Sequence, residues 1–379
     1  MNFDFTADQY ALRDTIRGYL DDHWASPQLR ATLSGPGLPA ALWDELAELG
    51  LTTVLVPELY GGLGLTLTDA SLLFETFGET LVPGLFAETM LASDVIARFG
   101  TADQKTALLP GIAEGRMKLT TAVGESSTSF DLAEIKATAV RASNGWQLNG
   151  HKSIVPFAEY ADRVLVAAHA EPGRPLAFFV VDPAAAGVAL FPHVLVDPTW
   201  RASSLVLKNV SLPTDAMLGD ADGRAVDHGM RTAAAANAAQ LTGIAGHALG
   251  MTLDYAKQRK QFGRTIGSFQ AIKHKLADMM VTYETSRSAA YYAHWSLAQG
   301  DAGQIAAVSL AKAYAGDMSR AVVNESIHIH GGIGFTWDYD LHLFLKRAKV
   351  LEYAAGDAGW HREQYARAHE SPHFLLPPG

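Results

Sequence analysis

Two segments in the C-terminal half of the chain contain residue types that are common in binding and catalytic sites. The first is Arg259-Lys260-Gln261-Phe262-Gly263, running on to Ser268-Phe269-Gln270, and the second is His330-Gly331-Gly332-Ile333-Gly334-Phe335. Taken singly, each has a structural explanation. A basic pair at a helix end complements the helix dipole, and a glycine run forms a turn between helices. No G-x-G-x-x-G follows a predicted strand and opens a helix, so a Rossmann dinucleotide site has no support.

Composition and charge limit the functions available to the chain. Its 379 residues, 48% hydrophobic and 18% charged, can bury a large core and predict more than one domain. A net charge of -10 argues against general nucleic-acid binding, although a local basic patch could still bind a small anionic ligand. There is no cysteine, which excludes disulfides and thiolate metal sites, and we assign no metal site. The acidic N-terminus and the lack of a long apolar stretch predict a cytoplasmic protein without a membrane span.

Changes in hydrophobic periodicity predict the elements that position the two segments. Apolar residues recur at helical spacing from Thr6 to about Arg116. Short strand-like runs follow, such as Val164-Leu165-Val166, separated by turn signals. After Gly229 the helical spacing returns over long, Ala-rich stretches that suit a four-helix bundle. We therefore predict an N-terminal helical domain at 1–117, a small antiparallel β barrel or sandwich at 118–228, and a C-terminal helical bundle at 229–379 that ends in a loose tail from residue 370.

Several motifs occur in a fixed order along the chain. They are Trp43 followed by residues 46–51, then residues 57–65, Gly115, residues 149–152, residues 259–270 and residues 330–335. Together they resemble the acyl-CoA dehydrogenase family over nearly the whole chain, with helical, β and helical domains in the family's order. The resemblance raises the weight of motifs that are weak singly.

The resemblance implies FAD-dependent α,β-desaturation of an acyl-CoA thioester. In the family, a glutamate removes the α-hydrogen as a proton, while the β-hydrogen leaves as hydride to the flavin. The arginine of the R-x-Q/T-F-G segment reaches the FAD pyrophosphate of the neighbouring subunit, because its planar fork suits phosphate oxygens. The cofactor-binding residues implied here are Arg259, Gln261, Phe262, Gln270, His328, Gly331 and Gly332. A helix cap and a tight turn stay the alternative for these segments.

The part of the flavin site that the family builds from its β domain is altered in this chain. The family's T-E-P-x-A-G-S-D is replaced by the sequence from Thr121 to Asp131, which includes Ser127-Thr128. In the family's G-x-K-x-W-I-T-N segment, the stacking tryptophan is Ile154 and the threonine near the flavin N5 is Pro156. Proline has neither a hydroxyl nor a backbone N–H to offer. We expect a poorly furnished flavin-ring site.

The family's catalytic base is also missing. One family position, counted from Ala348-Lys349, is Ala355, before Gly356-Asp357, and the other lies within Thr232-Ala233-Ala234-Ala235-Ala236. Neither offers a carboxylate. Glu352, Asp357 or Glu125 could substitute, although an ordinary surface position is the alternative that we favour for each. Loss of a general base costs about 10²- to 10⁴-fold in rate.

Some bacterial members of the family that act on bulky CoA esters, notably steroid side chains, are α2β2 heterotetramers. In these, one subunit type lacks a usable site and lends its helical domain to the FAD of its partner. This chain resembles that accessory type, which implies a homologous acyl-CoA dehydrogenase subunit and an electron-transfer flavoprotein as partners. The alternatives are a self-sufficient homotetramer with a relocated base at Asp357 or Glu352, and a flavin-free scaffold or binding protein. The sequence does not identify the acyl chain.

Overall fold

A computed structural model describes residues 4–35, 37–126 and 129–369. The chain divides into two compact units made of interleaved segments. The helical unit comprises Met1–Ser26, Leu67–Val82 and Ala234–Gly379, and the sheet unit comprises Pro27–Thr66 and Pro83–Ala233. The predicted division at residues 117 and 228 follows changes in secondary-structure type and stays a prediction. The predicted loose tail, residues 370–379, and Ser127-Thr128 lie outside the described residues.

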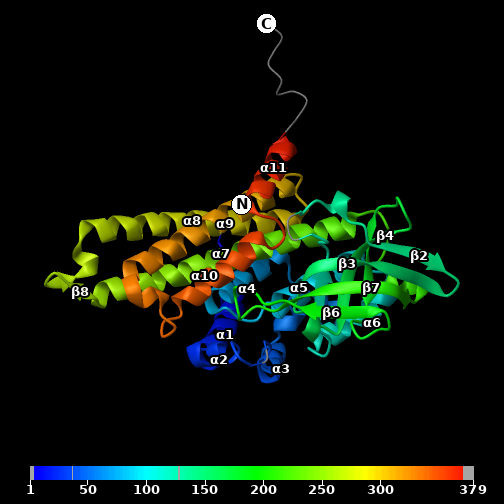
Figure 1. Cartoon of the computed structure of the whole chain (residues 1–379), viewed down its shortest axis with the longest axis horizontal. Helices are drawn as coiled ribbons and strands as arrows, with labels where there is room; N and C mark the ends of the chain where they lie inside the picture. Colours follow the sequence, from blue (N-terminus) through cyan, green and yellow to red (C-terminus); the bar gives the residue numbers. More distant parts are fainter. Residues whose placement is uncertain (1–3, 36, 127–128, 370–379) are drawn as a thin grey trace, which may run out of the picture. The chain divides into compact units, whose positions relative to one another are not determined.

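The order of elements confirms the predicted fold class (Figure 1). The helices are α1 (Ala7–His23), α2 (Ser26–Ala31), α3 (Ala40–Glu48), α4 (Leu67–Thr80), α5 (Leu85–Phe99), α6 (Ala102–Ala113), α7 (Arg224–Gln258), α8 (Gln270–Gln299), α9 (Gln304–His330), α10 (Leu341–Tyr353) and α11 (Ala358–His369). The strands are β1 (Leu119–Ala122), β2 (Thr138–Ala142), β3 (Gly145–Pro156), β4 (Arg163–Ala170), β5 (Leu176–Val181), β6 (Val188–Pro192), β7 (Ala202–Leu212), β8 (Lys260–Gln261) and β9 (Arg264–Thr265). Among these helices, none is long and apolar enough to cross a membrane.

In the sheet unit, seven strands form one sheet in the order β1-β4-β2-β3-β7-β6, and β5 also pairs with β4. Most pairings are antiparallel, as the hairpin-like turn signals predict. Two are not, because β1 and β2 each run parallel to β4. Such pairings join strands that are distant in sequence, so short-range turn signals do not indicate them. Buried residues of β1–β5 and β7 form one core with buried residues of α5 and α6.

In the helical unit, three long helices run through the bundle, namely α7 with 35 residues, α8 with 30 and α9 with 27. The first ten residues of α7 belong to the sheet unit. Helix α4 crosses α7 at two glycines. A Cβ added to Gly78 would lie 1.9 Å from the Gln240 carbonyl oxygen, and one added to Gly243 would lie 1.9 Å from the Glu75 carbonyl oxygen. Only glycine permits such a close backbone approach.

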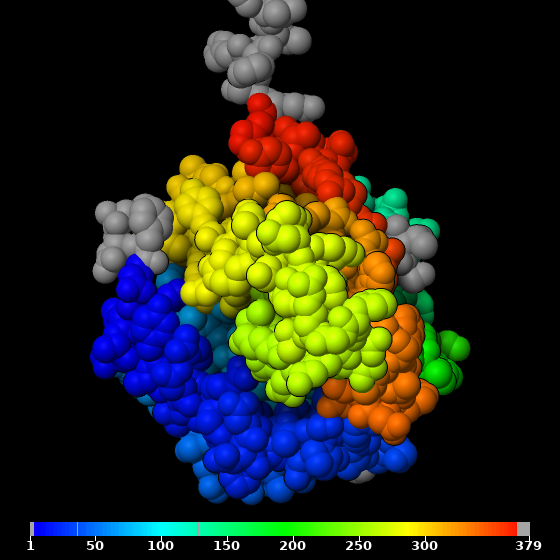
Figure 2. All heavy atoms as spheres, turned by 90° about the vertical axis from the view of Figure 1, so that its left-hand side faces the viewer, coloured from blue at the N-terminus to red at the C-terminus, as the bar shows by residue number. Residues whose placement is uncertain are grey.

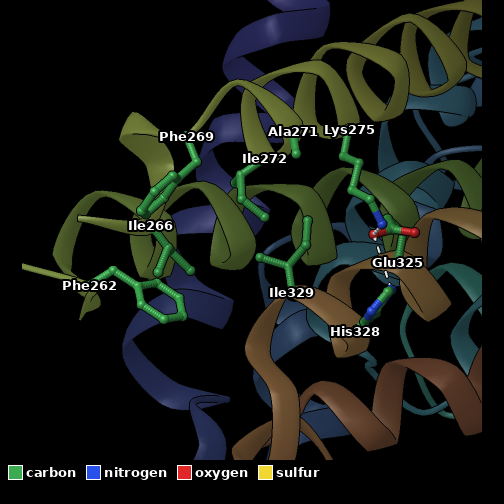
Figure 3. A pocket seen from close by; sticks show the side chains of 9 residues that line it. All are labelled: Phe262, Ile266, Phe269, Ala271, Ile272, Lys275, Glu325, His328 and Ile329. Carbon is green, nitrogen blue, oxygen red and sulfur yellow. Dashed lines mark hydrogen bonds and ion pairs between the residues drawn. The ribbon is translucent and has the colours of Figure 1, made fainter. Parts of the chain in front are cut away.

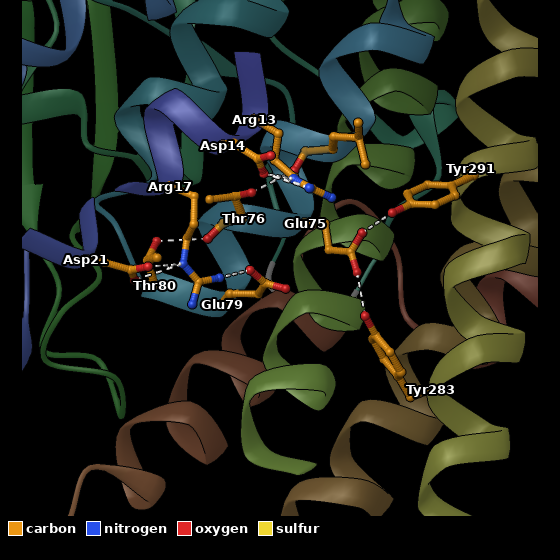
Figure 4. Close-up of polar contacts among 11 residues, drawn as sticks. Arg13, Asp14, Arg17, Asp21, Glu75, Thr76, Glu79, Thr80, Tyr283 and Tyr291 are labelled. Atoms are coloured by element: carbon orange, nitrogen blue, oxygen red, sulfur yellow. Dashed lines mark hydrogen bonds and ion pairs between the residues drawn. The ribbon is translucent and has the colours of Figure 1, made fainter. Parts of the chain in front are cut away.

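A buried carboxylate links α4 to α8 (Figure 4). Tyr283 Oη donates to Glu75 Oε1 at 3.0 Å, and Tyr291 Oη, two turns further along α8, donates to Glu75 Oε2. One turn after Glu75, Glu79 accepts a hydrogen bond from Arg17 of α1. Burial raises the pKa of Glu75, against the hydrogen bonds from the two tyrosines. These contacts join three helices that are far apart in sequence.

Candidate functional site: an apolar groove with a basic rim

The helical unit has a groove of about 370 Å³ where the loop between α7 and α8 meets the end of α9. Figure 2 views the face on which residues near 260 project, with the orange residues near 335 beside them. Figure 3 shows apolar side chains along most of the groove and charged ones at one end. The lining residues are Phe262, Ile266, Phe269, Ala271, Ile272, Lys275, Glu325, His328 and Ile329. A groove of this size and lining can hold the flat, partly apolar portion of a small ligand.

The loop between α7 and α8 is a two-residue hairpin that displays an aromatic ring. Strands β8 and β9 pair Lys260 with Thr265 and Gln261 with Arg264. The turn residues Phe262 and Gly263 have φ of +53° and +78°, the left-handed pattern of a type I′ turn. A bulky residue is rare at positive φ and costs of order 1–3 kcal/mol there. Phe262 is nevertheless 90% exposed, so a strained backbone holds an apolar ring out in solvent.

Basic residues gather on this loop although the chain as a whole is acidic. From residue 256 to residue 276 the sequence has six Lys and Arg and no Asp or Glu. Arg259 is exposed and follows the last residue of α7. Its backbone is fixed at both sides, because its N–H donates to Tyr255 O at 2.8 Å and its carbonyl accepts from Ile266 N at 2.8 Å. The guanidinium forms no ion pair or side-chain hydrogen bond within the described part of the chain, so it can bind an anion.

The glycine segment begins where α9 ends. Gly331 has φ +66° and ψ −143°, a conformation that an L-residue rarely adopts. A Cβ added to Gly331 or Gly332 would have no atom within 4 Å, so the backbone here faces open space. One turn earlier, His328 is exposed, and its Nδ1 lies 3.5 Å from Glu325 Oε1. Glu325 also pairs with Lys275 across the charged end of the groove.

The structure brings together only some of the residues expected to bind the cofactor. Phe262 and His328 line the groove itself. Arg259, Gln261, Gln270, Gly331 and Gly332 lie on the adjoining segments of the chain. Sequence inspection did not single out Ile266, Lys275, Glu325 or Ile329 as lining residues. Their spacing of three or four residues from Phe262, Ile272, His328 and Glu325 is a signal that could have indicated them.

Ala355, the position expected for a catalytic base, has a left-handed backbone with φ +56°. The backbone carbonyls of Glu352, Ala355 and Gly356 all accept hydrogen bonds. The buried Lys312 Nζ donates to Glu352 O at 2.9 Å and to Gly356 O at 2.7 Å. His361 Nε2 donates to Ala355 O at 2.9 Å. Burial lowers the pKa of Lys312 to about 7, and the Glu352 charge opposes that shift. These hydrogen bonds hold the backbone on both sides of Ala355. The Ala355 side chain is a methyl group, which cannot accept a proton.

The carboxylates of the three candidate substitutes for the base all form hydrogen bonds or ion pairs with other groups. The surface position favoured for Glu352 is wrong: its side chain is 7% exposed, with one oxygen 3.0 Å from Arg320 and the other 3.1 Å from Lys349. Burial and these ion pairs come from α9 and α10 together, which local sequence does not reveal. Asp357 is partly buried and caps α11, where its Oδ1 accepts from Trp360 N at 2.8 Å.

Glu125 is also not a surface carboxylate, since its side chain is 16% exposed. Its Oε1 accepts from Lys152 Nζ at 2.9 Å and from Ala137 N at 2.8 Å, and its Oε2 accepts from Lys136 N at 2.7 Å. Burial favours the neutral acid, but the Lys152 charge and these donors outweigh it and lower the pKa of Glu125. A carboxylate with a lowered pKa and three donors is a poor proton acceptor.

The sheet segment expected beside a flavin ring lacks the family's aromatic ring and threonine hydroxyl at two positions. Ile154 is 49% exposed near the end of β3, where the family has an aromatic side chain. Pro156 ends the strand, and its carbonyl accepts from Thr120 Oγ1 at 2.7 Å. Among the described residues, no group of three His, Asp or Glu side chains is arranged to hold a metal ion. The groups present fit the phosphate and adenosine portion of FAD better than its ring.

Comparisons with known proteins define the class of this fold and site. The family model described as acyl-CoA dehydrogenase, N-terminal domain, matches residues 6–116, and the C-terminal domain model matches residues 223–369. The acyl-CoA dehydrogenase FadE12 of Mycobacterium tuberculosis (strain ATCC 25618 / H37Rv) is 32% identical over 330 residues, 83% of each chain. This chain therefore belongs to the acyl-CoA dehydrogenase family, FAD-dependent oxidoreductases that act on CH–CH groups, and the resemblance inferred from sequence is confirmed.

Two solved structures are similar along nearly their whole length. A variant of the Tcur3481–Tcur3483 steroid ACAD is 33% identical, with a TM-score of 0.87, and the match covers 95% of this chain and 97% of that one. The ChsE4–ChsE5 complex from Mycobacterium tuberculosis is 25% identical, with a TM-score of 0.90, and the match covers 98% of this chain and 100% of that one. Each of the two is named as a pair of proteins.

Proposed function

We propose that this chain is the base-lacking accessory subunit of an α2β2 acyl-CoA dehydrogenase, in which its helical unit binds the pyrophosphate and adenosine side of its partner's FAD. One combination of features carries the proposal. The groove with its displayed Phe262 and unpaired Arg259 is intact, while the position of the base is Ala355. An enzyme that had lost its function, or a protein that serves only as a scaffold, would not be expected to keep the groove and Arg259 while lacking the base.

The chemistry explains why a partner is needed. Desaturation removes one proton and one hydride from adjacent carbons, and FAD, when bound, supplies the hydride acceptor. The proton requires a carboxylate that is free to accept it. Glu352 is held by two cations, Glu125 by three donors, and Asp357 caps a helix. The partner must therefore supply the base, while this chain supplies donors for the cofactor.

The proposed contacts of this chain with FAD follow from the residue types at the groove. Arg259 can donate two parallel hydrogen bonds to pyrophosphate oxygens. The open glycines Gly331 and Gly332 expose backbone to the ligand, and Phe262 offers an aromatic face. Gln261, Gln270 and His328 add donors and acceptors on the adjoining segments.

The substrate class and the redox partner rest on relatives. One of the similar structures is named as a steroid ACAD, which supports a bulky or steroid-derived CoA ester as substrate. Another similar structure, 26% identical, is described as an electron transferring flavoprotein of Acidaminococcus fermentans. We extend this to an electron-transfer flavoprotein as the acceptor of the electrons.

The test is the amount of FAD bound per chain, for this protein alone and for the protein co-purified with a homologous subunit. We expect little FAD alone and about one FAD per pair. Arg259→Ala should weaken FAD binding by the assembly about 10- to 150-fold, because a charge-assisted hydrogen bond contributes about 1.5–3 kcal/mol. Arg367→Ala removes the same charge from an exposed Arg367–Glu363 pair of α11 and is the matched control.

The outcomes separate the alternatives. Near one FAD per chain for the protein alone would contradict the accessory role and favour a self-sufficient homotetramer, with Asp357 and Glu352 as the carboxylates to substitute next. No FAD in any assembly, or an Arg259→Ala variant that binds FAD like Arg367→Ala, would favour a flavin-free scaffold or binding protein.

A further inference from the structure

His330 lies where the end of α9 meets the end of α7 and the segment before α10. It is the last residue of α9, immediately before Gly331, and it is 4% exposed. The ring of Tyr255, near the end of α7, stacks on it with centroids 4.3 Å apart. Tyr255 Oη also donates to the His330 carbonyl at 3.3 Å. On another side, His330 Nε2 lies 3.0 Å from the hydroxyl of Tyr339, which precedes α10.

The Tyr255 contact and the chain neighbours of His330 lead to residues assigned to the cofactor. Tyr255 O accepts the backbone N–H of Arg259, so the Tyr255 ring and Arg259 belong to one turn of chain. His328 and Gly331 flank His330 in α9 and the following turn. Phe262 lies on the hairpin that Arg259 begins. His330 thus connects the arginine segment to the glycine segment through a short chain of contacts.

The hydrogen bonds of His330 define its charge and tautomer. Its Nδ1 lies 2.7 Å from Ser326 O, a carbonyl that can only accept, so Nδ1 carries the proton. Burial lowers the pKa of His330, so the ring is neutral near pH 7. Nε2 is then an acceptor, and Tyr339 Oη donates to it. The ring is fully satisfied and held in one orientation.

We propose that the His330–Tyr339 pair is a positioning pair, which sets the Gly331–Gly332 backbone relative to Arg259 so that both can contact one FAD. This inference rests on the proposed function. Neither side chain needs to touch the cofactor. Gly331 has an unusual φ, and its backbone N–H donates to the Ile327 and His328 carbonyls at the end of α9, so the orientation of the glycine segment depends on how the last turn of α9 is held.

The experiment is a double-substitution cycle on the FAD-binding assembly. Tyr339→Phe removes only the hydroxyl, His330→Phe keeps a ring against Tyr255 but removes Nε2, and the double variant removes both partners. FAD affinity is measured by flavin fluorescence on reconstituting the apo-assembly, and the melting temperature is measured beside it. Tyr292→Phe removes an exposed hydroxyl from α8 and is the control.

We expect Tyr339→Phe to weaken FAD binding about 2- to 12-fold, the range of one hydrogen bond. The double variant should bind FAD no more weakly than whichever single variant has the lower FAD affinity, because both substitutions break the same His330–Tyr339 hydrogen bond. The order of the variants by FAD affinity should differ from their order by melting temperature.

The proposal is overturned if Tyr339→Phe binds FAD like Tyr292→Phe, if the two effects simply add, or if loss of affinity only follows loss of folded protein. Arg259→Ala separates this failure from a failure of the proposed function. If Arg259→Ala weakens FAD binding and Tyr339→Phe does not, only the positioning role falls. If neither weakens binding, the FAD site itself is wrongly placed.

Discussion

At the scale of single residues, Phe262 combines backbone strain with exposure. Replacing it with Asn creates an Asn-Gly turn, the favoured pair for a type I′ hairpin, while removing the ring. We expect Phe262→Asn to leave the free energy of unfolding unchanged or raised, since Asn tolerates positive φ. FAD binding by the assembly should weaken about 2- to 12-fold through loss of an aromatic contact. Urea unfolding measures the first expectation and FAD titration the second, and unchanged FAD affinity in Phe262→Asn would contradict a binding role for the ring.

Ala355 is the second residue with a strained backbone, and its methyl side chain has no assigned role that would offset this strain. With φ at +56°, Ala355→Gly should raise the free energy of unfolding by up to about 1 kcal/mol, because glycine adopts this conformation without a steric cost. The neighbouring Ala354 has φ −66°, so Ala354→Gly should lower it and is the control. Urea unfolding of both variants decides the matter. Equal destabilisation by the two substitutions would show that Ala355 is not strained.

At the scale of elements, buried acids on α4 should make the packing of α1 and α4 sensitive to pH. Burial raises the pKa of Glu79 to about 7, with Arg17 opposing the shift. A carboxyl whose pKa is raised on folding binds more protons in the folded state between about pH 4.5 and pH 7. Its contribution to stability is therefore present at low pH and is lost as the pH rises to about 7.

Glu79→Gln keeps the size of the side chain and an oxygen that can accept from Arg17, but it does not titrate. We expect the variant to lose less stability than the wild type between pH 5 and pH 7. Melting temperatures across this range provide the measurement. Asp14→Asn, at an exposed position of α1, is the control and should leave the pH dependence as it is. Identical slopes for Glu79→Gln and wild type would contradict the assignment of this dependence to Glu79.

At the scale of the whole molecule, the positions at which this chain departs from the family pattern fall in both compact units. Ala355 belongs to the helical unit, while Ile154 and Pro156 belong to the sheet unit. Repair of the helical unit alone would thus leave the flavin-ring segment unchanged.

This division predicts the result of adding a carboxylate. In the assembly with its partner, Ala355→Glu should leave turnover of acyl-CoA unchanged, because the partner supplies both the base and the ring site. In an enzyme that has a complete flavin-ring site of its own and lacks only the base, the same change would raise the rate by up to about 10²- to 10⁴-fold. Ala354→Glu adds the same charge one residue away and controls for it. A specific rise with Ala355→Glu would count against the accessory role.

Motifs and periodicity were enough to predict the family and the types of the elements, and they placed Ala355 at the position where a base is expected. These predictions depend on motifs and periodicities within short stretches, such as residues 259–270. The three-dimensional structure was needed to show that Glu352 is buried between two cations, that β1 and β2 run parallel to β4, and that His330 contacts Tyr255 and Tyr339. Burial, charge state and strand pairing arise from contacts between residues far apart in the chain. Because no local pattern encodes such contacts, the sequence could predict that a base is missing but could not reveal how Glu352 and Glu125 are held.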